Sequence, residues 1–322
     1  MVKVGDSSSS SSLGGPREKD PAVSRSDPSD SAASAPAEHE SVATILGEMD
    51  QLVGLSEAKQ QIRRIVATHE ANRVRQEHGH VRVPVALHLV FTGPPGTGKT
   101  TLARILARLY RAVGLLPSGH LVEADRGSLV AGYVGQTAIK VQEVVARADG
   151  GLLFIDEAYA LASDHGAGFG DEALATLVKE MENRRDRLAV VIAGYEDAIE
   201  DLLVSNEGLK SRFKQQVTFQ DYSKDELLAI FTGLAEQNQI IVDAAVSEAV
   251  LGHLEKAATS GAAGNARYVR NLFEDMFAHM SHRALEDGTI EPHEVIKFSV
   301  ADVPAVKTKP GHFGFVAGAD RD

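Results

Sequence analysis

Eight residues with the spacing of a phosphate-binding loop occupy positions 93–100. They read Gly-Pro-Pro-Gly-Thr-Gly-Lys-Thr and complete the pattern G-x-x-x-x-G-K-[ST]. An apolar stretch of strand length (85–91) precedes them, and a segment with helical apolar spacing (102–109) follows. A glycine-rich turn between a buried strand and a helix N-terminus directs several backbone N–H groups into one concavity. The context therefore favours a nucleoside triphosphate site over a merely flexible turn.

The side chains of this loop suit ATP and Mg²⁺. Lys99 supplies a positive charge for the β- and γ-phosphates, and the Thr100 hydroxyl is a Mg²⁺ ligand. The residues of the loop expected to contact ATP are Pro95, Gly96, Thr97, Gly98, Lys99, Thr100 and Thr101.

A second chemical signal follows a later strand. Four apolar residues, 152–155, precede Asp156 and Glu157. Ligands bind at the carboxyl ends of the strands in open parallel sheets, so both carboxylates are expected beside the phosphates. Asp156 is expected to hold Mg²⁺, and Glu157 to polarise the water that attacks the γ-phosphate. The pair alone means little, but together with the phosphate loop it predicts an ATPase.

Two further arginines are candidates for phosphate contacts. Arg212 precedes the last predicted strand, too far along the sheet to reach its own nucleotide, but it could act on a neighbouring subunit as an arginine finger. Taken alone, an exposed surface arginine is the simpler interpretation. Arg267, in the string Gly-Asn-Ala-Arg at 264–267, could fold back onto the γ-phosphate. Arg270, one turn further on, is the alternative.

The order of the elements predicts an α/β domain followed by a helical one. Strand-length apolar runs recur at 87–91, 120–123, 152–155, 188–193 and 216–219, with helical patterns at 100–111, 136–148 and 171–184 between them. Alternation of this kind predicts a parallel sheet sandwiched by helices. We expect a disordered leader at 1–45, the nucleotide-binding α/β domain at 46–221, a small all-α lid at 222–303 and a flexible tail at 304–322.

The expected lid begins with clear capping signals. Ser223 and Glu226 have the spacing of a capping box, Asp243 is expected to cap a second helix and Asn265 a third. In the third helix one apolar stripe predicts core packing. Its members are Val269, Leu272, Phe273, Met276, Phe277 and Met280.

Composition narrows the possible partners and compartments. The net charge of −12 argues against a broad nucleic-acid-binding face. No apolar run is long enough for a membrane span, and the charged start is not followed by the apolar core of a signal peptide. Cysteine is absent, which excludes disulfides and thiolate chemistry and agrees with a cytoplasmic location.

Over about residues 52–303 these motifs, in this order, resemble the AAA+ ATPases. The segments 151–159, 181–183, 193–195 and 264–267 are similar to the group that contains the red-type Rubisco activase CbbX, the sporulation protein SpoVK and the ATPase domain of the secretion protein EccA. EccA carries an N-terminal helical repeat domain where this chain has its leader, so we expect an organisation closer to that of CbbX.

The resemblance implies further roles for individual residues. Val53 and Gly54 would line the adenine pocket. Tyr133, Val134 and Gly135 match the aromatic–hydrophobic–glycine loop that hexamers of this family direct into a central pore. The alternative for Tyr133 is an ordinary loop or core tyrosine. One departure concerns the end of the fourth strand, where the family has a polar residue that positions the attacking water, because Gly194-Tyr195 stands there instead.

The sequence thus predicts a ring-forming ATPase, by resemblance a homo-hexamer, that remodels a protein client through its pore loop. Two alternatives are a nucleic-acid-associated AAA+ loader and an ATP-dependent scaffold with little turnover. The acidic composition argues against the first, and the intact Asp156–Glu157 pair with Arg212 argues against the second.

Overall fold

The computed structural model describes residues 40–83, 85–133, 135–162, 168–259, 264–286 and 288–306. These ranges fall within one compact unit that begins at His39. Residues 1–39 and 307–322, which hold most of the predicted leader and tail, lie outside the described residues. None of the helices in the described ranges combines the length and apolar character needed to cross a bilayer.

A five-stranded parallel sheet forms the centre of the α/β domain, which confirms the predicted fold class. Its strands are β1 (Leu89–Thr92), β2 (Leu121–Ala124), β3 (Leu152–Ile155), β4 (Ala189–Gly194) and β5 (Gln215–Thr218). The order β2-β3-β4-β1-β5 places β4 between β1 and β3. The carboxyl ends of β1, β3 and β4 are therefore neighbours at one edge of the sheet.

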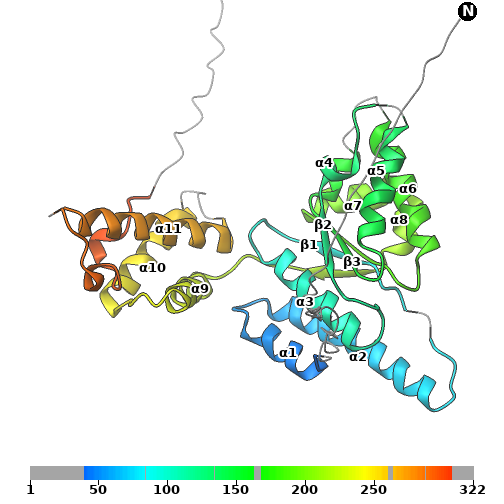
Figure 1. The fold of residues 1–322 in the computed structure, drawn as a ribbon, viewed down its shortest axis with the longest axis horizontal. Coiled ribbons are helices and arrows are strands. Elements are labelled where there is room, and N and C mark those ends of the chain that lie inside the picture. Colours follow the sequence, from blue (N-terminus) through cyan, green and yellow to red (C-terminus); the bar gives the residue numbers. More distant parts are fainter. Residues whose placement is uncertain are drawn as a thin grey trace, which may run out of the picture. The chain divides into compact units, whose positions relative to one another are not determined.

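Helices cover both faces of this sheet (Figure 1). One face packs against α1 (Val42–Gln51), α2 (Ser56–Glu77) and α3 (Lys99–Ala112). The other packs against α5 (Gln136–Arg147), α6 (Phe169–Asn183) and α7 (Glu196–Ser205). Short helical turns complete the domain: α4 (Arg126–Leu129), η1 (Ala158–Ala162) and α8 (Glu207–Arg212).

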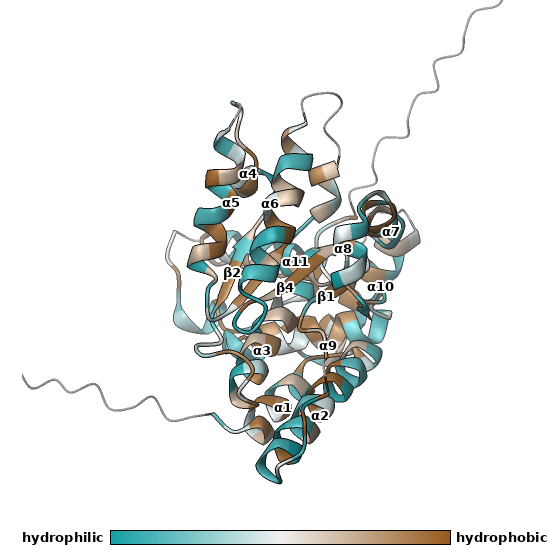
Figure 2. Cartoon of the chain, turned by 90° about the vertical axis from the view of Figure 1, so that its right-hand side faces the viewer, coloured by the Kyte–Doolittle hydropathy of each residue, from teal (hydrophilic) through white to brown (hydrophobic). Residues whose placement is uncertain are grey.

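The strands are apolar on both sides because both sides are buried. In β1, Leu89 and Phe91 join the core under α1–α3, whereas Val90 joins the core on the opposite face. This alternation follows from the two-residue period of a strand, and two covered faces require a continuous apolar run. Figure 2 shows these hydrophobic strands enclosed by helices whose outer faces are hydrophilic.

Helix α1 corrects the predicted end of the leader at residue 45. The helix begins at Val42, with Ser41 as its N-cap, and both Ile45 and Met49 are fully buried. Arg108 of α3 holds it by ion pairs with Glu40 (2.6 Å) and Glu48 (2.5 Å). The boundary was predicted from the average composition of the segment. Composition does not reveal that a few apolar residues at helical spacing are enough to pack a short helix against the core.

The lid contains α9 (Lys224–Gln237), α10 (Ala244–Thr259) and α11 (Asn265–Ala284), followed by the turns η2 (Pro292–Glu294) and η3 (Val300–Asp302). The capping box is present, since Glu226 N donates to Ser223 Oγ (3.2 Å) and Ser223 N to Glu226 Oε2 (2.8 Å). Asp243 also caps α10 as predicted, accepting from Val246 N at 3.0 Å. The α11 stripe forms the lid core, except that Phe277 is 45% exposed.

Asn265 does not cap α11, so that prediction was wrong. Gly264 occupies the N-cap position and offers no side chain, while Asn265 is already the first residue of the helix. Its backbone is left-handed, with φ of 55°. The amide instead bonds to residues far away in the chain, which local sequence patterns do not reveal.

Candidate active site

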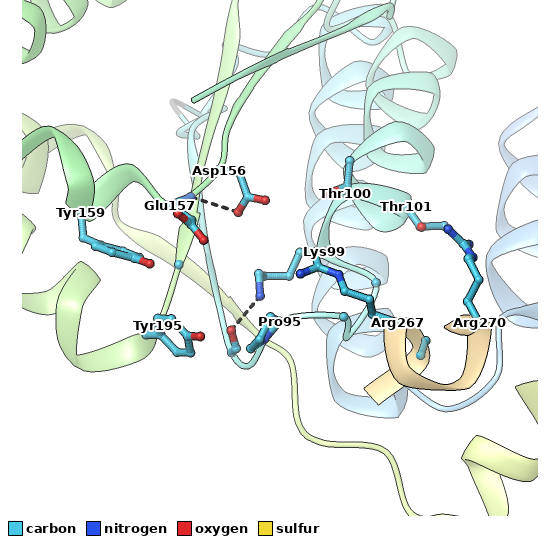
Figure 3. A pocket seen from close by; sticks show the side chains of 15 residues that line it. Pro95, Lys99, Thr100, Thr101, Asp156, Glu157, Tyr159, Tyr195, Arg267 and Arg270 are labelled. Atoms are coloured by element: carbon cyan, nitrogen blue, oxygen red, sulfur yellow. Dashed lines mark hydrogen bonds between the residues drawn. The ribbon is translucent and has the colours of Figure 1, made fainter. Parts of the chain in front are cut away.

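One pocket lies where the carboxyl ends of β1, β3 and β4 meet the first turns of α11 (Figure 3). The phosphate loop and the start of α3 contribute Gly93, Pro95, Gly96, Gly98, Lys99, Thr100 and Thr101. The segments after β3 and β4 contribute Asp156, Glu157, Tyr159, Gly194 and Tyr195, and α11 contributes Ala266, Arg267 and Arg270. Most of the predicted site residues therefore meet in one place.

The loop conformation depends on glycine. Gly96 and Gly98 have φ of 76° and 89°, in the left-handed region that disfavours other residues. Gly98 is also the N-cap of α3, so the unpaired N–H groups of that helix open onto the pocket. Thr97 is fully buried and its hydroxyl donates to Pro94 O at 2.8 Å. It braces the loop from within and does not line the pocket.

The Lys99 ammonium lies inside the loop. It donates to the carbonyls of Gly93 (2.7 Å) and Pro94 (2.8 Å). Burial lowers the pKa of Lys99, the Asp156 carboxylate opposes this shift, and the Arg267 guanidinium adds to it. The pocket is lined by three cationic side chains and two carboxylates, and this excess of positive charge suits a multiply charged anion.

The two carboxylates follow β3 as predicted. Asp156 continues the sheet, its N–H donating to Ala124 O at 2.9 Å. The Glu157 N–H donates to Asp156 Oδ1 at 3.0 Å, and Glu157 itself is left-handed, with φ of 48°. That conformation costs a non-glycine residue about 1–2 kcal/mol. Such strain concentrates at functional sites, where the surrounding structure holds it in place.

Two tyrosines form the wall of the pocket beside Glu157. The rings of Tyr159 and Tyr195 lie with centroids 6.0 Å apart and planes at 46°. Gly194 makes room for this pair, because a Cβ there would lie 2.8 Å from Tyr159 Cδ1. Tyr195 directly follows β4, which ends at Gly194. Sequence reasoning missed Tyr159, whose one signal is its position two residues after Glu157.

Both candidate arginines of α11 line the pocket, so its lining does not choose between them. In Figure 3 Arg267 extends toward Lys99, while Arg270 lies on the side of Thr101. The helix meets the loop directly, since Ala266 N donates to Gly96 O at 3.1 Å.

The predicted adenine-binding residues do not line this pocket. Gly54 is left-handed (φ of 62°) and packs against the start of the lid, because a Cβ there would lie 2.5 Å from Glu226 Oε1 and 3.0 Å from Tyr222 Cε1. Its neighbour Val53 is half-buried. The segment approaches the phosphate loop, since a Cβ at Gly98 would lie 3.5 Å from Leu55 Cδ1.

Arg212 and the predicted pore loop also lie outside the pocket. Arg212 ends α8, and its guanidinium donates to Glu182 Oε2 and to Gly208 O, both at 3.1 Å. Tyr133 is 74% exposed, and Gly135, with φ of 80°, is the N-cap of α5. Val134 lies outside the described residues.

Comparison with known proteins identifies the class. The model of the AAA family, ATPases associated with various cellular activities, matches residues 89–221, and that of the AAA lid domain matches 223–311. This chain belongs to the AAA ATPase family. It is 38% identical over 252 residues to stage V sporulation protein K of Bacillus subtilis, covering 77% of this chain and 78% of that protein.

The second group of relatives comes from secretion systems. The chain is 43% identical over 238 residues to the ESX-1 secretion system protein EccA1 of Mycobacterium tuberculosis, covering 70% of this chain and 42% of EccA1. The chain thus spans about two fifths of the length of these relatives. The resemblance to the SpoVK and EccA group is confirmed.

Solved structures agree on the fold. The FIGL-1 AAA domain in complex with ADP superposes with a TM-score of 0.55 at 19% identity, covering 83% of this chain and 90% of that one. A Thermotoga maritima RuvB mutant superposes with a TM-score of 0.52 at 20% identity, covering 77% and 70%.

Proposed function

We propose that this chain hydrolyses ATP to ADP and phosphate as a subunit of a homo-hexameric ring and uses the turnover to remodel a protein client. One observation carries the proposal: Lys99, Asp156, Glu157 and Arg267 line a single pocket at the carboxyl edge of the sheet. A phosphate cradle, two carboxylates and a lid cation are the parts that phosphoryl transfer to water requires.

In this mechanism the loop holds the phosphates. Lys99 exchanges its bonds to the carbonyls of Gly93 and Pro94 for the β- and γ-phosphate oxygens of ATP. Oxygen donors of the kind that Mg²⁺ prefers are at hand, because the Thr100 hydroxyl and the Asp156 carboxylate line the same pocket. The metal would neutralise charge that develops on the phosphates.

The groups around Glu157 handle the attacking water. Glu157 accepts the proton of that water, and the Tyr195 hydroxyl orients it in place of the usual polar residue at the end of β4. Arg267 contacts the γ-phosphate and so couples the nucleotide state to the lid, with Arg270 as the alternative. Val53 and Gly54 do not line the pocket around the phosphates, so in this mechanism they bind the adenine beyond it.

Arg212 acts on the ATP of the next subunit. It does not line the pocket of its own chain, and Glu182 holds it near the surface. An arginine held in this way can exchange its carboxylate partner for a phosphate across a subunit interface, which would make activity depend on ring assembly.

Tyr133 grips the client. It is the most exposed aromatic side chain in the described residues, at 74%, and lines a shallow groove with Ile139, which is 55% exposed. Aromatic contact of this kind depends little on the client's sequence. Val134 extends the contact, and Gly135 lets the loop bend.

The relatives suggest the cellular setting of the client. Their names point to a secretion-associated or sporulation-associated protein, and the resemblance to CbbX adds a Rubisco-activase-like role. For each of these roles we propose that the chain acts in the cytoplasm. The scaffold alternative predicts ATP binding without turnover, and the loader alternative predicts stimulation by nucleic acid, so steady-state ATPase assays with and without DNA separate all three.

Mixing two inactive variants tests the ring. Arg212→Ala should retain ATP affinity and lose about 10³–10⁵ in rate, or about 4–7 kcal/mol of barrier stabilisation. Lys99→Ala should lose ATP binding. Mixed subunits should recover activity, because some interfaces then join an intact pocket to an intact finger. No recovery, with a rate per subunit independent of protein concentration, would rule out action in trans.

A further inference from the structure

Three successive carbonyls of the phosphate loop accept hydrogen bonds from the lid and from residues 219–223, the segment between β5 and α9, called the hinge below. Asn265 Nδ2 donates to Pro95 O at 3.3 Å. Ala266 N donates to Gly96 O at 3.1 Å. Tyr222 Oη, from the segment between β5 and α9, donates to Thr97 O at 3.3 Å. Because these bonds direct the carbonyls of the loop toward the lid, the N–H groups of the loop point the opposite way, toward the place where the phosphates bind.

Asn265 joins the elements of this arrangement. Besides reaching the loop, its Nδ2 donates to Asp221 Oδ1 at 2.7 Å, and its Oδ1 accepts from Tyr222 N at 2.9 Å. These partners fix the orientation of the amide, because only the NH₂ group can face the carboxylate and only the oxygen can face the N–H. The side chain is buried, so each lost bond would leave a desolvated polar group.

The phosphate loop and the start of α11 are tightly packed against each other. A Cβ at Gly96 would lie 2.7 Å from Gly264 O and 3.1 Å from Arg267 Cβ. Arg267 follows Asn265 by two residues on the same helix, so the amide that fixes the start of α11 also fixes where this arginine enters the pocket.

We propose that Asn265 is a positioning residue that docks the lid on the phosphate loop, presetting the loop for the nucleotide and placing Arg267. The proposal rests on the proposed nucleotide site, and it makes the lid part of that site. If Asn265 served only to begin α11, a single capping hydrogen bond would be enough. Its amide instead connects α11 to the phosphate loop and to the hinge.

An exchange of functional groups tests the proposal. Asn265→Asp keeps an acceptor for Tyr222 N but faces the Asp221 carboxylate with a second one and loses the donor to Pro95 O. We expect calorimetric Kd values for ADP and a non-hydrolysable ATP analogue to rise roughly ten- to hundred-fold, the range for a buried hydrogen bond to a charged group. The double variant Asn265→Asp/Asp221→Asn restores the bond between residues 265 and 221 with its polarity reversed, but it still leaves Pro95 O without its donor. It should therefore recover thermal stability while binding nucleotide more weakly than the parent.

Two controls separate positioning from folding. Asn265→Gly tolerates the left-handed backbone but lacks the amide, so it should bind nucleotide as weakly as Asn265→Asp even where the latter folds poorly. Asn238→Asp makes the same chemical change on an exposed lid residue at the end of α9 and should bind like the parent.

The outcomes are distinguishable from failure of the proposed function. If the parent chain binds no nucleotide, the site itself is wrong. If the parent binds and Asn265→Asp or Asn265→Gly binds equally well, with only a lower melting temperature, the residue serves folding alone and the inference is overturned. A double variant that regained the full affinity of the parent without the donor to Pro95 O would overturn it as well.

Discussion

A methyl group at Gly96 should separate the lid from the phosphate loop. Gly96→Ala introduces a side chain at φ of 76° and places its Cβ 2.7 Å from Gly264 O. The left-handed conformation costs about 1–2 kcal/mol. Because Gly264 O is a backbone atom at the start of α11, the clash is relieved only when the helix moves and the bond from Ala266 N to Gly96 O breaks, at about 1 kcal/mol.

The costs divide between stability and nucleotide affinity. In the free protein the lid can move away, so the free energy of unfolding falls by the left-handed strain and the lost bond, about 2–3 kcal/mol together. Nucleotide binding also requires the lid to return against the clash, and because each 1.4 kcal/mol of that clash raises Kd tenfold, we expect the Kd for ADP by calorimetry to rise at least about tenfold. Gly233→Ala, in α9 with no heavy atom within 4 Å of the new Cβ, is the matched control. It should bind like the parent and be more stable by about 0.5–1 kcal/mol. Parent-like affinity of Gly96→Ala would refute the contact between lid and loop.

The other predictions concern the predicted pore loop and the buried histidines. Tyr133→Ala should have the melting temperature of the parent, because its ring is 74% exposed, and it should abolish client remodelling. Tyr110→Ala removes a fully buried ring and should lower the free energy of unfolding by about 3–5 kcal/mol. A loss of that size for Tyr133→Ala would make Tyr133 a core residue. Burial lowers the pKa of both His69 and His88 to about 4. Because these folded-state pKa values lie below the unfolded value near 6.5, each neutral histidine contributes its full stabilisation of the fold above pH 6.5. That stabilisation declines as the pH falls from 6.5 to 4. Urea titrations should show the free energy of unfolding falling by up to about 3 kcal/mol for each histidine, and constant stability across that window would contradict both assignments.

Much of the sheet and of the pocket could be predicted because the signals are local. A buried parallel strand needs a continuous apolar run, so β3 at Leu152–Ile155 matches its prediction residue for residue. β2 (Leu121–Ala124) is displaced by one residue from the expected 120–123, because hydrogen-bonded register, not composition, ends a strand. The carboxylates could be placed because they directly follow β3, and Lys99 because the loop that holds it joins β1 to α3.

The remaining features depend on contacts between distant residues. Asn265 has the sequence appearance of a cap, and only the folded chain brings it beside Asp221 and Pro95. The same holds for Tyr159, whose place in the pocket depends on Gly194 of a different strand. The docking of α1 depends on Arg108, some sixty residues later in the chain. Periodicity cannot reveal such pairings.

The most direct test of ATP hydrolysis in this pocket compares phosphate release by the parent chain and by Glu157→Gln at saturating ATP and Mg²⁺. The variant preserves the shape of the side chain at φ of 48° but removes the carboxylate that we propose as the acceptor of the proton from the attacking water. The parent should release phosphate steadily, and Glu157→Gln should bind ATP with similar affinity while turning over about 10²–10⁴-fold more slowly. Equal rates for the two proteins would contradict the assignment of Glu157 and place the hydrolytic base elsewhere.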